Sequence, residues 1–214
     1  VVKGKNGIMN SIPANTIIVD HTTASAKIAG ELYNYCKKTN NVSFMDAPVS
    51  GGQAGAENGQ LTIMLGGDEA TYSKIEPLLK SYAKNSTLVG QSGSGQLAKM
   101  VNQICIAGLL QGLSEAINFG QKVNLDIEKV IGVIKDGAAS SWQMQNRYQT
   151  MSNDEFNFGF AVEWMRKDLK ICLEQADEVG ARLPITAIID QFYSNIINIG
   201  GKRWDTSSLI KLLR

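Results

Sequence analysis

The sequence contains very little of what metal sites, disulfide frameworks and membrane segments require. It has one histidine and three cysteines in 214 residues, and no Cys-x-x-Cys pair, so we expect no metal site. The thiols Cys36, Cys105 and Cys172 fall within helical patterns. This placement predicts reduced core or half-buried cysteines in a cytosol-like, cytoplasmic setting. No uninterrupted apolar run approaches the ~20 residues of a membrane span, so we expect no membrane association.

An excess of charge of one sign is also missing. Lysine and arginine number 21 against 20 acidic residues, for a net charge of +1. This balance gives no reason to expect a nucleic acid or an anionic lipid surface as a partner. The hydrophobic share of 43% and the charged share of 19% are those of an ordinary soluble globular protein.

The first part of the chain alternates between strand and helix patterns. This alternation predicts an α/β lobe with a mostly parallel sheet. We expect a loop over 47–52, a short helical turn ending near 59, and a short last strand. The expected strands are 16–20, 42–46, 61–65 and 87–89, and the expected helices are 25–38 and roughly 69–82.

Polar residues follow two of these expected strands. Ligands of open α/β sheets bind outside the carboxyl ends of the strands, and here those ends carry Thr22-Thr23 and Ser50-Gly51-Gly52. The second run offers a hydroxyl and closely spaced backbone N–H groups that can approach a carboxylate. Taken alone, however, the run is better interpreted as a plain loop. The single histidine, His21, is expected to be a satisfied loop residue rather than a catalyst.

A long apolar helix is predicted from Ser94, its expected N-cap, to about Lys122. The apolar face is too wide for a surface helix, so we expect the helix to be buried. Lys99 lies near its start and has no acidic neighbour at the i±3 or i±4 positions. Two readings follow: a lysine that extends its ammonium to water, or a buried general acid/base. Asn102 and Gln103 follow one turn later.

The sequence after about Lys122 is predicted to be nearly all helical. We therefore expect two domains, 1–92 and 93–214, the second one all-helical. Trp142 is either part of a specificity wall or a core residue. The expected helices begin at Asp126, at Ser140 or Ser141, at Phe160 (to Val179), at Pro184, and at Ser207 (to Arg214).

Several motifs occur in the order found in β-hydroxyacid dehydrogenases. They are Asp20-x-Thr22-Thr23, Asp46-Ala47-Pro48-Val49-Ser50-Gly51-Gly52, Leu61-Thr62-Ile63-Met64 with Gly66-Gly67, Gly93-x-Gly95-x3-Lys99-x2-Asn102, Lys167-Asp168-Leu169 and Asp205-x-Ser207-x-Leu209. Over essentially its whole length the chain resembles the 3-hydroxyisobutyrate and tartronate semialdehyde dehydrogenase group, akin to 6-phosphogluconate dehydrogenase. The fold implied is an incomplete Rossmann-like lobe with a mostly parallel sheet, followed by an all-α C-terminal lobe joined through the long buried helix.

The resemblance implies an NAD- or NADP-dependent dehydrogenase of a small 3-hydroxy acid or its semialdehyde. It makes Lys99 the general acid/base and Asn102 or Gln103 the group that orients the hydroxyl. It assigns the substrate carboxylate to Ser50, Gly51 and Gly52. Thr23 and Lys167 would contact the cofactor, with Asp168 in support. A homodimer or homotetramer is also implied.

Two features depart from the family pattern. Many relatives have Asn-Asn where this chain has Asn102-Gln103, which leans toward tartronate-semialdehyde-type members. There is also no Gly-x-Gly-x-x-Gly after a first strand. We therefore expect two further βα units of roughly 30 residues each upstream of Val1, and read the chain as the C-terminal portion of a longer dehydrogenase.

Two other function classes stay open at this stage. The chain could be a catalytically silent fragment or pseudoenzyme whose helices act as an oligomerisation module through Leu109-Leu110-Leu113 and Ile188-Ile189-Phe192. It could also be a reductase of an imine or a phosphorylated sugar acid. Few arginines are available for a phosphate ester, since the chain has only Arg147, Arg166, Arg182, Arg203 and Arg214.

Overall fold

The computed structural model describes residues 1–39 and 41–214 and divides into two compact units. Unit 1 runs from Val1 to Val101 and unit 2 from Asn102 to Arg214. The boundary falls inside the long helix α4 (Ser94–Lys122), which supplies residues to both units.

Unit 1 alternates between strands and helices, as the sequence predicts. It opens with the 3₁₀ helix η1 (Ile8–Asn10) and closes with the first turns of α4. The elements between them are β1 (Ile17–Asp20), α1 (Ala26–Lys38), β2 (Ser43–Asp46), β3 (Val49–Ser50), α2 (Gly52–Glu57), β4 (Leu61–Gly66), α3 (Glu69–Leu79) and β5 (Ala83–Gly90).

The sheet is mostly parallel, which confirms the predicted α/β class. β1 pairs with β2 in parallel, and β4 pairs with β5 in parallel. The two pairs are joined through antiparallel contacts of β2 and β3 with β4. The expectation of a loop over 47–52 is wrong at Val49–Ser50, because these residues pair with Ile63 and Thr62. β5 is also longer than the predicted short strand at 87–89.

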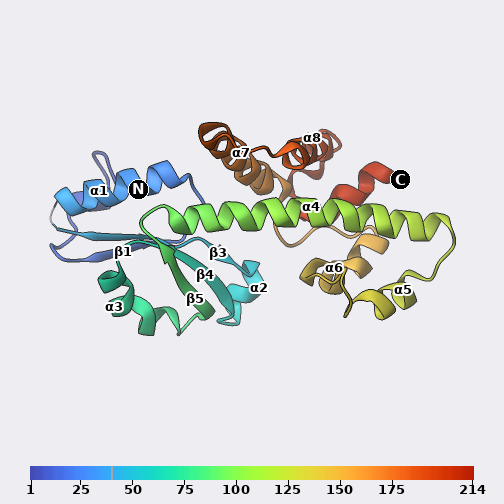
Figure 1. Ribbon diagram of the computed structural model, residues 1–214, viewed down its shortest axis with the longest axis horizontal. Coiled ribbons are helices and arrows are strands. Elements are labelled where there is room, and N and C mark those ends of the chain that lie inside the picture. Colours follow the sequence, from blue (N-terminus) through green and yellow to red (C-terminus); the bar gives the residue numbers. More distant parts are fainter. Residues whose placement is uncertain (40) are drawn as a thin grey trace. The chain divides into compact units, whose positions relative to one another are not determined.

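The two faces of this sheet are covered by different helices (Figure 1). Alternation along the strands sends neighbouring side chains to opposite faces. Phe44 packs in a cluster with α1 residues such as Ala29. The next residue, Met45, packs in a cluster with the α3 residues Ile75 and Leu79. The strand ends that carry the motif loops are therefore held by two apolar layers.

Unit 2 is helical, as predicted. Leu110 of α4 packs with α7 and α8, and Leu113 with α5 and α6. Leu109, Leu110, Leu113, Ile189 and Phe192 belong to or pack against this unit's own core. The elements after α4 are α5 (Ile127–Ile134), α6 (Trp142–Ser152), α7 (Val162–Val179), α8 (Pro184–Asn198), and the 3₁₀ helices η2 (Gly201–Arg203) and η3 (Thr206–Leu213).

Several expectations about the helices need correction. α4 is not buried throughout, because Val101 is 62% and Phe119 65% exposed, and Cys105 is exposed too. The predicted α-helix at the C-terminus is a 3₁₀ helix, whose first turn Asp205 caps by accepting from the Ser207 N–H. Over 1–39 and 41–214, no helix combines the length and apolar character needed to cross a bilayer.

Candidate functional site

The start of α4 is held by a buried carboxylate rather than by the predicted serine cap. Ser94 is itself the first helical residue. The Asp46 oxygens Oδ1 and Oδ2 accept hydrogen bonds from the backbone N–H groups of Gly93, at 2.7 Å, and Gln96, at 3.0 Å. A carboxylate satisfies N–H groups that a helix N-terminus leaves without partners, and its charge suits the positive end of the helix dipole.

The glycines of this motif are explained by close packing. Gly93 has φ +94°, a left-handed conformation that favours glycine. A Cβ at Gly95 would lie 2.5 Å from the Met64 carbonyl oxygen and 2.9 Å from the Asp46 Oδ2. The Gly-x-Gly spacing therefore lets α4 approach β2 and β4 closely. Burial raises the pKa of the Asp46 carboxyl, and the N–H groups of Gly93 and Gln96 oppose that effect.

Gln96 is a site residue that the sequence analysis missed. Its side chain is buried, with 1% of the residue exposed. The amide Nε2 donates to the Thr22 carbonyl at 2.7 Å, and Oε1 accepts from the Ala24 N–H at 2.9 Å. Gln96 thus clamps the backbone on both sides of Thr23. The sequence signal that could have identified it is an uncharged polar side chain, directly after Gly95, on a helix that the sequence predicts to be buried.

The Ser50-Gly51-Gly52 run lies at the end of β3 and the start of α2. Gly51 has φ +130° and Gly52 φ +61°, so both use backbone conformations that other residues rarely adopt. Ser50 is half-buried, and both glycines are exposed. The run therefore offers a hydroxyl and accessible backbone N–H groups at the end of a paired strand.

Lys99 is buried inside the first turns of α4. Only 7% of it is exposed, although lysine is among the residues least often found inside proteins. This overturns the alternative in which Lys99 extends to water. It lies three residues after Gln96, hence about one helical turn further along α4.

The structure brings four of the predicted residues together in unit 2. Asn102 Nδ2 donates to Gln103 Oε1 at 2.8 Å, and Gln103 Nε2 donates to Asp168 Oδ2 at 2.7 Å. The other oxygen of Asp168 lies 3.0 Å from the Lys167 ammonium. Gln103 and Asp168 are each 2% exposed, and the Lys167 side chain is 49% exposed. The result is a polar chain that begins at a half-buried amide and ends at a half-exposed cation.

Trp142 is not the core residue that one reading proposed. It is 59% exposed, and the Arg147 guanidinium lies 4.8 Å from its ring centroid. Arg147 also lies 3.3 Å from the buried Asp205 carboxylate, so its position is set from two sides.

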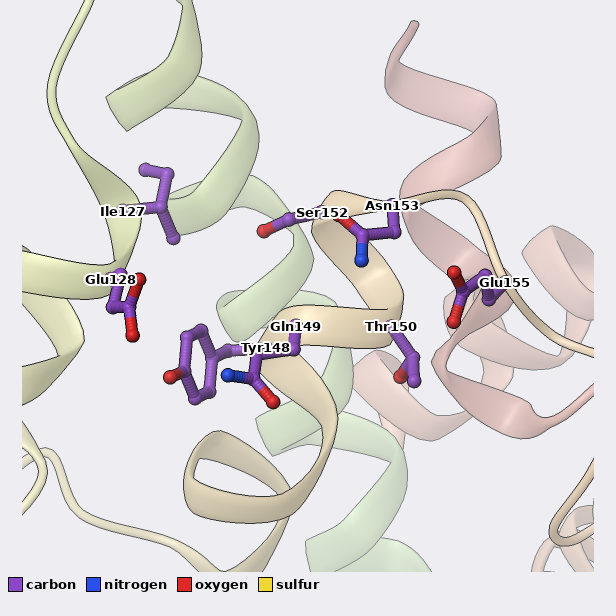
Figure 2. Close-up of a pocket in the computed structure, with 8 residues that line it drawn as sticks. All are labelled: Ile127, Glu128, Tyr148, Gln149, Thr150, Ser152, Asn153 and Glu155. Carbon is purple, nitrogen blue, oxygen red and sulfur yellow. The ribbon is translucent and has the colours of Figure 1, made fainter.

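A hollow on unit 2 is formed by other residues. It measures about 480 Å³, and Figure 2 shows Tyr148 and Gln149 of α6 facing Ile127 and Glu128 of α5 across it. None of the predicted site residues lines it.

Outside Asn40, no three histidine, cysteine or acidic side chains gather in a way that could hold a metal ion.

Two family models together match almost the whole chain. The model described as the NAD binding domain of 6-phosphogluconate dehydrogenase matches residues 1–90. The model described as NAD-binding of NADP-dependent 3-hydroxyisobutyrate dehydrogenase matches residues 93–213.

Individual proteins show the same likeness. An uncharacterized oxidoreductase of Shewanella frigidimarina is 54% identical over the full chain and 73% of its own length. The 2-hydroxy-3-oxopropionate reductase of Escherichia coli is 35% identical, again over the full chain and 73% of its own length. The solved structure of Mycobacterium tuberculosis 3-hydroxyisobutyrate dehydrogenase with L-serine is 27% identical, with a TM-score of 0.86 over 96% of this chain and 72% of that one.

The motifs, the α/β and helical units and these matches agree with one another. The chain belongs to the β-hydroxyacid dehydrogenase family, whose members are NAD(P)-dependent oxidoreductases related to 6-phosphogluconate dehydrogenase.

Proposed function

We propose that this protein transfers a hydride between a nicotinamide cofactor and a small 3-hydroxy acid or its semialdehyde, with Lys99 as general acid/base. The observation that carries the proposal is the burial of Lys99 in α4, one turn after a segment anchored by Asp46 and Gln96. A lysine held in this way is positioned rather than free to sample solvent.

The residues present fit a nicotinamide cofactor. Thr23 lies at the carboxyl end of the parallel strand β1, where ligands of such sheets bind, and Gln96 clamps its loop. Lys167 offers a half-exposed cation beside Asp168. We assign cofactor contacts to Thr23 and Lys167, with Asp168 in support. When bound, NAD or NADP supplies the hydride acceptor or donor. In this proposal, residues 1–92 belong to a dinucleotide-binding domain and 93–214 to a substrate and dimerisation domain.

Lys99 would move the proton of the reacting hydroxyl. An alcohol is a very weak acid, so a base must take the hydroxyl proton as the hydride leaves carbon. In the oxidation direction the Lys99 Nζ takes this proton, and in reduction it returns the proton to the carbonyl oxygen.

The Ser50-Gly51-Gly52 run would hold the substrate carboxylate. Its hydroxyl and exposed backbone N–H groups are donors, as a carboxylate requires. The positive φ angles of both glycines support this role, because consecutive residues of unusual backbone conformation can turn their N–H groups toward one anion.

The hydrogen-bond chain in unit 2 favours Asn102 over Gln103 as the residue that orients the hydroxyl. Both ends of the Gln103 amide are already engaged, by Asn102 and by Asp168. Gln103 therefore fixes the amide nitrogen of the half-buried Asn102, and in this proposal the Asn102 amide oxygen orients the hydroxyl. Compared with the Asn-Asn pair of many relatives, this chain therefore keeps Asn102, which orients the hydroxyl, and differs at Gln103, which supports Asn102.

We propose tartronate semialdehyde (2-hydroxy-3-oxopropionate) or 3-hydroxyisobutyrate as substrate. The names of the relatives support this choice. A phosphate ester is disfavoured, because Arg147, Arg166, Arg203 and Arg214 already pair with carboxylates of this chain. A cytoplasmic homodimer or homotetramer completes the proposal.

Replacing Lys99 tests the proposal. We expect Lys99→Met to lower kcat by about 10²–10⁴-fold, the usual contribution of a general acid/base, while the Kd for NADP stays the same. Lys170→Met is the matched control, because that side chain is 76% exposed. If Lys99→Met keeps the activity of the control, the assignment of Lys99 is wrong. If the unsubstituted protein shows no turnover of either substrate, the silent-module alternative gains support.

A further inference from the structure

The one histidine of the chain takes no part in the proposed reaction, yet it joins two motif loops. His21 follows β1 and is half-buried. Its Nδ1 lies 2.7 Å from the Ala47 carbonyl oxygen, and its Nε2 lies 3.0 Å from the Tyr82 hydroxyl. The two rings meet edge to face, with centroids 5.7 Å apart and an interplanar angle of 87°.

These partners define where the protons lie. A carbonyl oxygen can only accept, so His21 Nδ1 carries a hydrogen and donates it to Ala47. With that hydrogen on Nδ1, the other nitrogen, Nε2, is placed to accept from the Tyr82 O–H. Burial raises the pKa of the Tyr82 phenol, which keeps this donor protonated.

Ala47 is where the carboxylate-binding segment begins. It is fully buried, and its N–H donates to the Asp20 carbonyl at 2.8 Å. Both polar backbone groups of Ala47 are therefore bonded to residues 20 and 21. Three residues later, Ser50 pairs with Thr62 of β4. The segment is thus fastened at Ala47 by the end of β1 and at Ser50 by β4.

We propose that His21 is a positioning residue, which acts through the Ala47 carbonyl to keep the Ser50-Gly51-Gly52 donors in register with the Thr22-Thr23 loop. This inference rests on the proposed function of those two loops. In this arrangement His21 acts through Ala47 and not on a reactant, so its loss should weaken binding of the acid rather than slow the proton transfer by Lys99.

Steady-state kinetics with tartronate semialdehyde and NADPH test this role. For His21→Leu we expect the KM for the semialdehyde to rise about tenfold, equivalent to about 1.4 kcal/mol of lost binding, with kcat and the KM for NADPH nearly unchanged. His21→Asn should recover most of the loss, because its side-chain N–H can donate to Ala47. Tyr82→Phe should have a smaller effect in the same direction. Tyr148→Phe, in the hollow of unit 2 (Figure 2), is the control for removing a phenol.

Amide hydrogen exchange supplies a readout that does not depend on turnover. Residues 47–52 should exchange faster in His21→Leu than in the unsubstituted protein, while β4 and α3 keep their protection. Unchanged exchange in 47–52 overturns the inference, as does an unchanged KM or an equal rise in both KM values. A failure of the unsubstituted protein to reduce any semialdehyde would instead count against the proposed function, and exchange would still decide whether His21 positions the loop.

Discussion

Asp46 is the residue on which the start of α4 depends most directly. Each of its two carboxylate oxygens accepts a backbone N–H, from Gly93 and from Gln96. In Asp46→Asn, one of these oxygens becomes an NH₂ group that faces an N–H donor. We expect a loss of about 1–3 kcal/mol in the free energy of unfolding, the cost of leaving a buried donor without a partner. Urea denaturation measures it, and Asp126→Asn, at an exposed cap, is the control. Equal losses for the two variants would contradict this expectation.

The raised pKa of Asp46 predicts a pH dependence with a definite sign. The carboxyl keeps its proton to higher pH in the folded protein than in the unfolded chain. Its contribution to stability is therefore full below the unfolded value of about 3.9, and is lost as pH rises through the raised folded pKa. The free energy of unfolding of the unsubstituted protein, minus that of Asp46→Asn, should decrease over this window. Urea titrations at a series of pH values check the sign, and an increasing difference would refute the direction.

The three thiols should differ in reactivity according to burial. Burial raises the pKa of Cys36, and burial together with the charge of Asp168 raises the pKa of Cys172 to about 12. Only the thiolate is nucleophilic, and Cys105 is the exposed one of the three. Iodoacetamide at pH 8 should therefore modify Cys105 first, with Cys36 and Cys172 following only in urea. Peptide mapping by mass spectrometry identifies the sites, and native labelling of Cys172 as fast as Cys105 would oppose the prediction.

At the scale of elements, α4 is joined to the β1–α1 loop through one side chain. Gln96→Leu leaves the Thr22 carbonyl and the Ala24 N–H without their partner. We expect unfolding to become easier by about 1–3 kcal/mol and NADP to bind more weakly, because the Thr23 loop loses its clamp. Gln111→Leu on the same helix is the control, since it removes only an exposed bond to Glu115. Calorimetric titration with NADP measures the Kd, and an equal Kd for the two variants would argue against the role of Gln96.

Helix and strand boundaries were predicted correctly where the residues that define them are close together in the sequence. The helices expected from residues 25 and 126 do start there, because the side chains of Ser25 and Asp126 accept hydrogen bonds from the N–H groups of Ile28 and Lys129. The prediction failed at Val49–Ser50, because a strand of two residues exists only through its pairing with β4. It also failed at Ser94, because the acceptor that caps α4 comes from Asp46, distant in sequence.

At the scale of the whole molecule, the proposed oligomer should depend on exposed apolar residues. At the end of α4 and just beyond it, Phe119, Val123 and Leu125 are 65%, 48% and 51% exposed. Neighbouring exposed apolar residues are typical of a contact surface. We expect Phe119→Asp to lower the mass measured by size-exclusion chromatography with light scattering toward that of one chain, and Lys170→Asp to leave it unchanged. A single-chain mass for the unsubstituted protein would refute the proposed association.

The sequence by itself determined the class of the protein. Strand and helix periodicity, with motifs at the expected spacing, placed Ser50-Gly51-Gly52 in a loop that follows a strand and Lys99 on a long helix. These are local properties, because periodicity and glycine conformation depend on a few consecutive residues. The family matches agree with that reading.

Only the tertiary structure decided which side chains hold the site. Apart from Asn102, which directly precedes Gln103, the partners of Asp46, Gln96, Gln103 and His21 lie 26 to 74 residues away along the chain, and no local pattern encodes such distances. The structure also decided the burial of Lys99 and the exposure of Trp142. A helix pattern shows which residues share a face, but whether that face meets protein or water depends on what packs against it.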